Sequence, residues 1–267
     1  SNAVLAAIAA EAAEAAGVPA GAVGLVAGGG REELARLATQ DGVVDLIFPR
    51  GGEGLKAALK AVATVPVIYA ASGNCHVFVD ASADLEAAEA IVLNAKVQRP
   101  GVCNAAETLL VHARAAPAFL PRALRALHDA GVELRVDGRS RATAGALAPA
   151  LIDATEEDWD TEFLALVLAV KVVGSVEEAI AHVNAHGSGH SEAIVTNDAA
   201  AARAFERGVD AACVYVNAST RFTDGGEFGM GAEIGNSTQK LHARGPIGLR
   251  ELCTFKYVVA GDGHVRP

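Results

Sequence analysis

The chain has 267 residues, of which 51% are hydrophobic, so it can bury a large core. Its formal net charge of −10, without clusters of Lys and Arg, argues against nucleic acid or a membrane surface as partner. No apolar run reaches the roughly 20 residues that span a bilayer. The four cysteines are widely spaced, as expected in a reducing compartment. We therefore expect a soluble cytoplasmic protein whose ligands are small molecules.

The first 70 residues alternate between helical and strand patterns. The first helix should stop at Gly17 and Pro19, because Gly and Pro have the poorest helix propensities. This β-α-β-α-β order predicts a parallel sheet with short crossovers. The predicted elements are a helix at 3–16, a strand at 22–26, a helix at 31–40, a strand at 43–48, a helix at 54–63 and a strand at 65–70.

The same alternation continues after residue 76 and predicts a second parallel α/β unit. The Ala-rich and Gly-rich residues 139–149 are predicted to be a surface connection. The change in composition between Val65 and Asn74 is the predicted domain boundary. Strands are predicted at 77–79, 108–111, 132–136, 166–173, 193–195 and 213–216, and helices at 83–96, 118–130, 176–186 and 199–207.

One candidate for chemistry is Cys103, in the segment 98–104 between a predicted helix and a predicted strand. Pro100 and Gly101 should end the helix in a sharp turn that presents the thiol at the rim of the sheet. A neighbouring guanidinium such as Arg99 would lower the pKa of the thiol and favour the nucleophilic thiolate. A buried structural cysteine is the alternative, and the sequence context alone leaves the two equally weighted.

Two further segments have the composition of binding loops. Gly51 and Gly52 follow the strand that ends in Phe48, and paired glycines let backbone amides approach a phosphate-bearing or nicotinamide-bearing ligand. A tight connection between strand and helix accounts for them equally well. Residues 217–229 are polar and glycine-rich and directly follow a strand, where Arg221 offers a planar fork for phosphate or carboxylate.

Three histidines recur every four residues, at His182, His186 and His190. On one continuous helix they would line one face as metal ligands do. Gly187 and Gly189 interrupt that helix, and no carboxylate completes a metal-binding spacing. We expect no metal site.

Five segments resemble the hallmark segments of the gamma-glutamyl phosphate reductase family, within the aldehyde dehydrogenase superfamily. The resemblance extends over nearly the whole chain. It implies a parallel-sheet catalytic domain that carries the nucleophilic cysteine, joined to part of a Rossmann-like cofactor domain. The segments are 47–52 (IFPRGG), 94–104 (NAKVQRPGVCN), 187–196 (GSGHSEAIVT), 214–226 (VYVNASTRFTDGG) and 237–246 (STQKLHARGP).

The resemblance implies roles for individual positions. Cys103 becomes the nucleophile that attacks the acyl phosphate of L-glutamyl 5-phosphate, and hydride from NADPH then reduces the thioester to glutamate 5-semialdehyde. The implied cofactor-binding residues are Arg50, Gly51, Gly52, Glu162 and Phe163, and the implied substrate-binding residues are Arg99, Asn217, Ser219 and Arg221. The implied domains are 1–71 for the cofactor, 72–245 for catalysis and 246–267 for oligomerisation, with a strand at 254–259 that pairs across subunits.

The resemblance also implies a truncation and a partner. The family's earlier segment is absent, with its cofactor-binding lysine and a proposed oxyanion-hole asparagine, so we expect this chain alone to have little activity. A homo-oligomer and an association with glutamate 5-kinase are implied. Aldehyde-oxidising relatives carry a glutamate general base near residues 68–73, whereas this sequence has Tyr69, Ala70, Ala71 and Ser72 there. A semialdehyde-oxidising dehydrogenase and a non-catalytic assembly domain remain the alternatives.

Overall fold

The computed structural model describes residues 1–26, 28–69 and 72–267. It divides into two compact units, Ser1–Ile68 and Tyr69–Pro267, and each unit is described by itself. Among the described residues, no helix combines the length and the apolar character needed to cross a membrane. The division into three domains at residues 71 and 245 stays a prediction.

The N-terminal unit contains the three expected helices but not the expected sheet. The helices are α1 (Asn2–Ala15), α2 (Arg31–Leu37) and α3 (Glu53–Val62). Of the strands predicted at 22–26, 43–48 and 65–70, only a single parallel bridge between Ile47 and Val67 is present, and Ala70 lies outside the described residues. The strand prediction was wrong here because strands need neighbours, and one parallel pair cannot satisfy a ladder of backbone hydrogen bonds.

The second unit confirms the predicted α/β class. Within its described residues, seven parallel strands form one sheet in the order β4-β3-β5-β2-β1-β6-β7, and two short strands form a separate antiparallel pair. The elements are β1 (Cys75–Val79), α4 (Leu85–Val97), β2 (Ala106–His112), α5 (Ala116–Asp129), β3 (Glu133–Val136), α6 (Gly138–Thr143), η1 (Gly145–Ala150), β4 (Ile152–Asp153), η2 (Glu156–Asp160), β5 (Val167–Val173), α7 (Val176–His186), β6 (Ser191–Val195), α8 (Ala199–Gly208), β7 (Cys213–Val216), η3 (Thr220–Phe222), β8 (Asn236–Ser237) and β9 (Gly245–Pro246).

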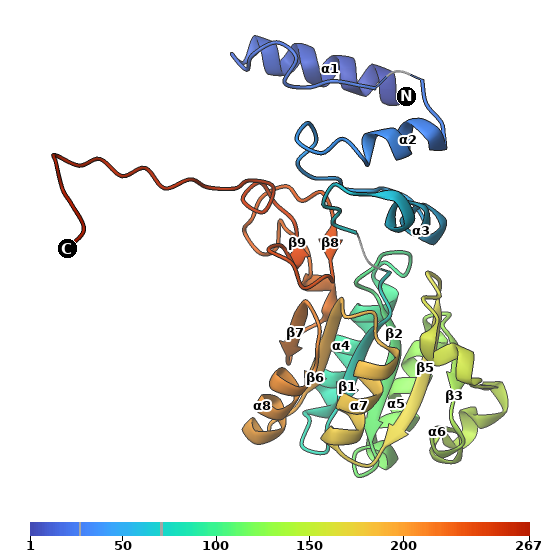
Figure 1. Ribbon diagram of the computed structural model, residues 1–267. Coiled ribbons are helices and arrows are strands. Elements are labelled where there is room, and N and C mark those ends of the chain that lie inside the picture. Colours follow the sequence, from blue (N-terminus) through green and yellow to red (C-terminus); the bar gives the residue numbers. More distant parts are fainter. Residues whose placement is uncertain (27, 70–71) are drawn as a thin grey trace. The chain divides into compact units, whose positions relative to one another are not determined.

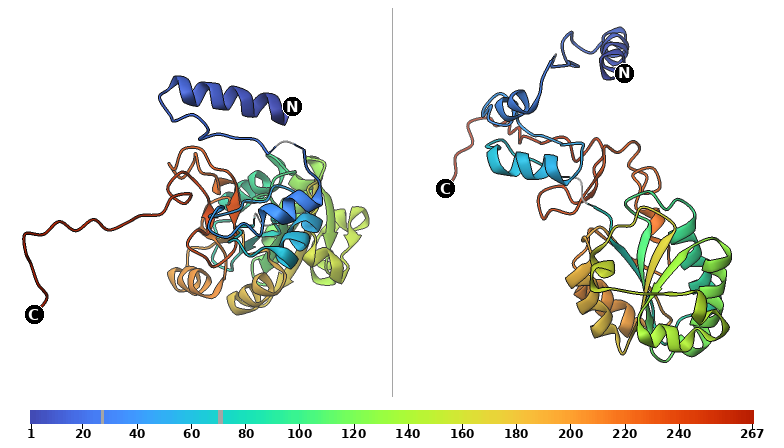
Figure 2. Two further views of the ribbon diagram at one scale, coloured as in Figure 1. Left: turned by 45° about the horizontal axis from the view of Figure 1, so that its top comes forward. Right: turned by 90° about the vertical axis from the view of Figure 1, so that its right-hand side faces the viewer.

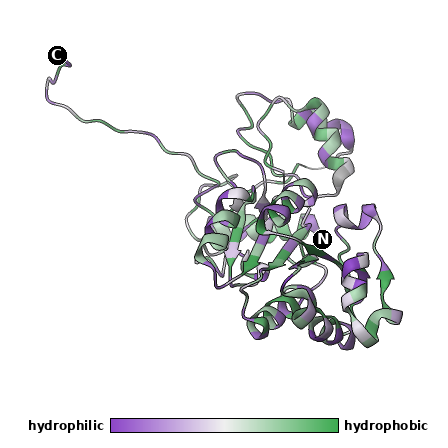
Figure 3. Cartoon of the chain, turned by 90° about the horizontal axis from the view of Figure 1, so that it is seen from below, coloured by the Kyte–Doolittle hydropathy of each residue, from purple (hydrophilic) through white to green (hydrophobic). Residues whose placement is uncertain are grey.

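Helices cover both faces of this sheet, which explains the nearly continuous apolar sequence of its strands. All residues of β1, β2 and β6 are buried. One apolar cluster lies between the sheet and α4 and α5, and a second lies under α7 and α8 (Figures 1 and 2). The hydropathy colouring shows that the strands between the two layers of helices are mainly hydrophobic, whereas the helices carry both hydrophobic and hydrophilic residues (Figure 3).

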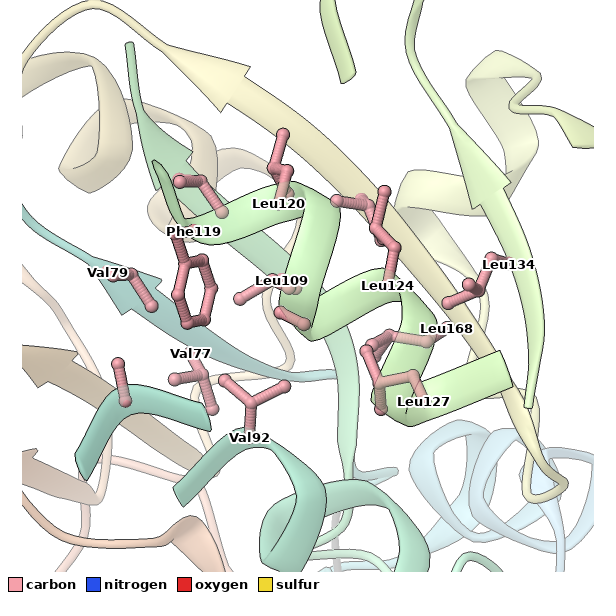
Figure 4. Close-up of a cluster of buried hydrophobic side chains, with 14 of the residues drawn as sticks. Val77, Val79, Val92, Leu109, Phe119, Leu120, Leu124, Leu127, Leu134 and Leu168 are labelled. Atoms are coloured by element: carbon pink, nitrogen blue, oxygen red, sulfur yellow. The ribbon is translucent and has the colours of Figure 1, made fainter. Parts of the chain in front are cut away.

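The larger cluster is built around α5, whose apolar residues recur at helical spacing. Phe119, Leu120, Leu124 and Leu127 are all fully buried, and they pack against strand residues such as Leu109 (Figure 4). Spacings of three and four residues place these side chains on one face of the helix. This stripe fixes α5 against the sheet.

Two predictions for the second unit were wrong. Residues 139–149 are not a simple surface connection but form most of α6 and η1, with Ser140 and Leu147 buried. Arg141 ties these turns together by donating to the carbonyls of Ala148 and Leu151, at 2.7 and 2.9 Å. The predicted strand at 254–259 has no regular structure in this chain, since no described strand lies beside it to pair with.

The α5 stripe yields a stability prediction. Leu124→Ala should destabilise the second unit by about 2–5 kcal/mol, because it leaves a cavity in a fully buried cluster. Urea unfolding can be followed by the fluorescence of Trp159, the single tryptophan, which is buried in this unit. Leu249→Ala, at a side chain that is 76% exposed, is the matched control and should shift the midpoint little. Equal shifts for both variants would contradict the assignment of the core.

Candidate active site

Cys103 lies in the turn between α4 and β2, as the sequence predicts. Asp84 starts α4 by accepting hydrogen bonds from the backbone amides of Glu86 and Ala87, at 2.9 and 3.1 Å. The helix ends before Pro100, and the chain enters β2 at Ala106. A connection from a helix into a parallel strand lies at the strand's amino end, so the thiol lies at that rim and not at the carboxyl rim, where ligands of open α/β sheets usually bind.

The segment leading into β1 packs against the backbone of Cys103. A Cβ atom built on Gly73 would lie 1.7 Å from the carbonyl oxygen of Cys103, so only glycine fits at this position. The same carbonyl accepts a hydrogen bond from the Cys75 thiol at 3.2 Å. The Gly73 amide donates to Glu162 Oε1 at 2.6 Å. These contacts bring Cys103 and Glu162 together, although they are far apart in sequence.

The Cys103 side chain is half-buried, and this position raises the pKa of the thiol. Desolvation is the largest cause, and the negative charge of Glu162 adds to it. The backbone of Cys103 and the guanidinium of Arg221 act in the opposite direction. The expectation that Arg99 lowers this pKa was wrong, because Arg99 is exposed and is not among the main groups acting on the thiol.

The loop after β7 returns toward the amino ends of the strands. It turns at Asn217, whose φ of 56° is a left-handed conformation that asparagine tolerates better than most residues. Thr220 Oγ1 then donates to the carbonyl of Asn104 at 2.7 Å, and Asn104 Nδ2 donates to the carbonyl of Thr223 at 2.9 Å. The loop is therefore fastened directly to the residue after Cys103.

Arg221 is the predicted substrate residue that the structure brings to the thiol. Its Nε donates to Gln98 Oε1 at 2.8 Å, and its pKa is lowered by burial and by the nearby charge of Arg99. Arg221 and Gln98 line a cavity of about 230 Å³, together with Asp224 and others. This cavity offers a cation for a carboxylate or phosphate and a carboxylate for an ammonium group.

Of the other three substrate candidates, Arg99 is exposed and close enough to Arg221 for its charge to act there, and its contact with a substrate stays a prediction. Asn217 and Ser219 have partners within the protein. Both amide atoms of Asn217 are held by the backbone of Thr196, at 2.8 and 3.0 Å. Ser219 is buried, and its hydroxyl accepts from the amide of Arg221 at 3.3 Å. These bonds shape the loop, and a direct contact of either side chain with a substrate stays a prediction.

A buried ion pair supports the segment that carries Glu162. Lys96 and Glu107 are both fully buried, with Lys96 Nζ 2.5 Å from Glu107 Oε2. Burial is the main reason that the pKa of Glu107 rises to about 7 and that the pKa of Lys96 falls. Glu107 Oε1 also accepts from the amide of Leu164 at 3.3 Å. The sequence analysis missed this pair, whose only sequence signal is two charged residues in apolar elements.

The predicted cofactor residues fall into both units. Phe163 lies under the guanidinium of Arg135, with 5.1 Å between its ring centroid and Cζ, beside Glu162. Arg50, Gly51 and Gly52 lie in the N-terminal unit, where Gly52 is the N-cap of α3. A Cβ on Gly51 would lie 2.6 Å from a methyl carbon of Leu55, so a larger residue there would require the Leu55 side chain to move. The roles of these residues toward a cofactor stay predictions.

The spaced histidines have protein partners. His182 is buried on α7, and burial together with the charges of His76 and Lys171 lowers its pKa to about 2. His186 Nδ1 lies 2.8 Å from Asp160 Oδ1. In the part of the chain that the structure describes, no three His, Cys, Asp or Glu side chains form a metal-binding group.

Comparison with known proteins gives matches along the whole chain. The model of the aldehyde dehydrogenase family matches residues 1–144 and 122–258. The gamma-glutamyl phosphate reductases of Syntrophomonas wolfei and Thermobifida fusca are 55% and 56% identical over 266 residues. The chain spans 62% and 63% of the lengths of these two relatives.

Solved structures agree with these sequence matches. The crystal structure of gamma-glutamyl phosphate reductase from Thermotoga maritima has a TM-score of 0.93 and 48% identity, and the match covers 100% of this chain and 63% of that one. An acetylating aldehyde dehydrogenase from Geobacillus thermoglucosidasius has a TM-score of 0.69 at 20% identity, over 98% of this chain and 66% of its own. The second likeness concerns the fold alone.

The packing of Gly73 against Cys103 can be tested by Gly73→Ala. The added methyl group must displace the Cys103 backbone, so we expect a lower unfolding midpoint and a several-fold change in the rate at which iodoacetamide alkylates Cys103. Peptide mapping after timed labelling measures that rate. Gly138→Ala is the control, because a Cβ at Gly138 meets no atom within 4 Å. Unchanged stability and labelling in Gly73→Ala would show that the close approach is absent in solution.

The electrostatics of the thiol can be tested by charge removal. Glu162→Gln should speed alkylation of Cys103 several-fold at pH 8, because it removes a charge that raises the thiol pKa, and Arg221→Gln should slow it. Since the pKa of Cys103 lies above its ordinary value, the wild-type rate should still rise at pH 9. The exposed Cys253 is the internal control, and its rate should not respond to either substitution. Slower alkylation in Glu162→Gln or faster alkylation in Arg221→Gln would contradict this account.

Proposed function

Because the chain belongs to the aldehyde dehydrogenase family, we propose that it is the thiol-bearing part of a gamma-glutamyl phosphate reductase, which reduces L-glutamyl 5-phosphate with NADPH. The observation that supports this most is Cys103, which is half-buried at the rim of the sheet with Arg221 acting on it. Identity of more than 50% to named reductases along the whole chain supports the substrate class.

The chemistry begins at the sulfur of Cys103. As a thiolate it attacks the carbonyl carbon of the acyl phosphate, the bond from that carbon to the phosphate oxygen breaks, and phosphate leaves with both electrons of that bond. A thioester to Cys103 remains. Arg221 is the cation positioned to stabilise the negative charge that develops on phosphate. When hydride reaches the thioester carbon, the carbon–sulfur bond breaks, and glutamate 5-semialdehyde and the thiolate are released.

The residues present fit a nicotinamide cofactor beside the thiol. Glu162 is held by the Gly73 amide near Cys103, so a ribose hydroxyl bound to its carboxylate would lie next to the reacting carbon. The cofactor supplies the hydride when it is bound. Gly51 and Gly52 belong to the N-terminal unit, and their role toward a cofactor stays a prediction.

Two observations bear on the alternatives. The sequence places no carboxylate at 69–72, where aldehyde-oxidising relatives carry their general base, and this favours a reductase that keeps its thioester from hydrolysis. Ala70 and Ala71 lie outside the described residues. Cys103 is only half-buried, which argues against a non-catalytic assembly domain. Assembly as a homo-oligomer, association with glutamate 5-kinase and a cytoplasmic location stay predictions.

A turnover assay tests the proposal. The reverse reaction, oxidation of glutamate 5-semialdehyde with NADP, should require phosphate, whereas a semialdehyde-oxidising dehydrogenase would run without it. A version of the chain extended at its amino end by the family's cofactor segment should turn over at least tenfold faster than the chain itself. Cys103→Ser should abolish that activity, and Cys253→Ser should leave it unchanged.

Two outcomes would count against parts of the proposal. Equal rates for the chain and its extended version would contradict the expectation that the chain alone has little activity. Turnover that does not depend on phosphate would assign the protein to the oxidising dehydrogenases.

A further inference from the structure

A second cavity, of about 400 Å³, lies in the same unit beside the loop between α7 and β6. Its walls are residues 187–189 of that loop, Glu192 on β6 and residues from the segment 238–244. It shares no lining residue with the cavity at Arg221. Its volume is within the range of small-molecule sites, and the proposed reaction assigns it no role.

One wall of the cavity carries an acceptor without a partner. Glu192 is fully buried, and its Oε2 accepts from the amide of His76 at 2.7 Å and lies 3.0 Å from the ring Nδ1 of His76. Its Oε1 has no hydrogen-bond partner among the described residues. A Cβ on Gly187 would lie 2.9 Å from Oε1, so a side chain at position 187 would press on this buried oxygen. An unsatisfied buried carboxylate oxygen is costly, and an ammonium group would satisfy it.

The opposite wall is cationic. Arg244 Nη2 donates to Asp210 Oδ1 at 3.0 Å, and Lys240 forms an ion pair with the other oxygen of the same carboxylate. Two cations on one anion leave one positive charge uncompensated within this group. The Nε of Arg244 is also buried without a partner in the described part of the chain. This wall therefore suits a carboxylate.

The two walls lie beside residues that are two positions apart in the chain. Glu192 Oε1 lies near Gly187, and a Cβ on Gly189 would lie 3.8 Å from Arg244 Nη2. The Cα atoms of Gly187 and Gly189 are at most about 7 Å apart, because each residue spans at most roughly 3.6 Å of chain. An α-amino acid carries its ammonium and its carboxylate on one carbon, so a single head group presents both charges to walls that neighbour residues 187 and 189.

We infer that this cavity binds the head group of an α-amino acid, with the ammonium on Glu192 and the carboxylate on Arg244 and Lys240. The head group would belong either to a free amino acid or to the glutamyl substrate. The inference goes beyond the proposed function, because binding is measured without turnover. A chain that binds an amino acid here but never reduces an acyl phosphate would refute only the proposed function.

Three ligands test the two walls separately by calorimetry on the chain. L-Glutamate carries both charged groups of the head group, the α-ammonium and the α-carboxylate. Glutarate lacks the ammonium group, and 4-aminobutyrate lacks the α-carboxylate. We expect L-glutamate to bind at least tenfold more tightly than either analogue, a difference of about 1.4 kcal/mol or more in binding free energy. Equal affinities for the three ligands, or no binding of L-glutamate at millimolar concentration, would overturn the inference.

Substitutions then assign each group to its wall. Glu192→Gln should remove most of the preference for L-glutamate over glutarate, and Arg244→Gln the preference over 4-aminobutyrate. Arg122→Gln, which breaks an exposed ion pair with Glu89, is the matched control and should change neither preference. Trp159 fluorescence checks folding. Should Glu192→Gln fail to fold, Arg244→Gln and the ligand series still decide.

Two further measurements complete the test. Arg221→Gln tests whether L-glutamate binds in the cavity near Cys103 instead. If Arg221→Gln abolishes L-glutamate binding and Arg244→Gln leaves it unchanged, the inference is overturned. In the extended enzyme, competitive inhibition by L-glutamate against the acyl phosphate would support a head-group site for the substrate. Non-competitive inhibition that Arg244→Gln relieves would support a separate site for a free amino acid.

Discussion

The contact between Gly73 and the backbone of Cys103 determines the geometry of the candidate active site. With no side chain at Gly73, the strand entry lies against the turn that carries the thiol. The Cys103 carbonyl is then within reach of the Cys75 thiol, and the Gly73 amide is free to hold Glu162. The position of the thiol thus follows from the position of β1, a fully buried central strand of the sheet.

The charges around Cys103 differ in how firmly they are held. Lys96 and Glu107 are fully buried and fixed on each other, so they support geometry at a considerable cost in desolvation. Glu162 and Arg221 are only partly buried and act on the thiol with opposite signs. Because burial already disfavours the thiolate, the balance between these two side chains sets how readily Cys103 reacts. A substrate phosphate that engages Arg221 would change that balance.

Sequence patterns predicted the second unit well because its elements are locally consistent. The apolar runs of β1 and β2 and the helical spacing on α5 indicate buried strands and a packed helix wherever they occur. The N-terminal strands failed because a strand depends on distant partners. Position in the chain identified Cys103 and Arg221 as candidates, but proximity in sequence wrongly suggested Arg99 as the cation for the thiol.

Other features had no signal within one sequence. The requirement for glycine at position 73 comes from a backbone 30 residues further along the chain, whereas a lone glycine is equally common in turns, helix caps and bulges. The Lys96–Glu107 pair joins a helix to a strand across one turn of the chain, which no periodicity describes. Such a pair can be predicted only when the positions of the helix and of the strand that carry it are known.

The turn that carries the thiol and the second cavity both depend on the register of β1. Cys75 contacts the Cys103 turn, and His76 contacts Glu192 on β6. The register between β1 and β2 is irregular between these two residues. A shift of one residue would break both contacts. The buried His76–Glu192 contact and the close approach of Gly73 both oppose that shift. The thiol and the second cavity are thereby positioned by one strand, without any direct contact between them.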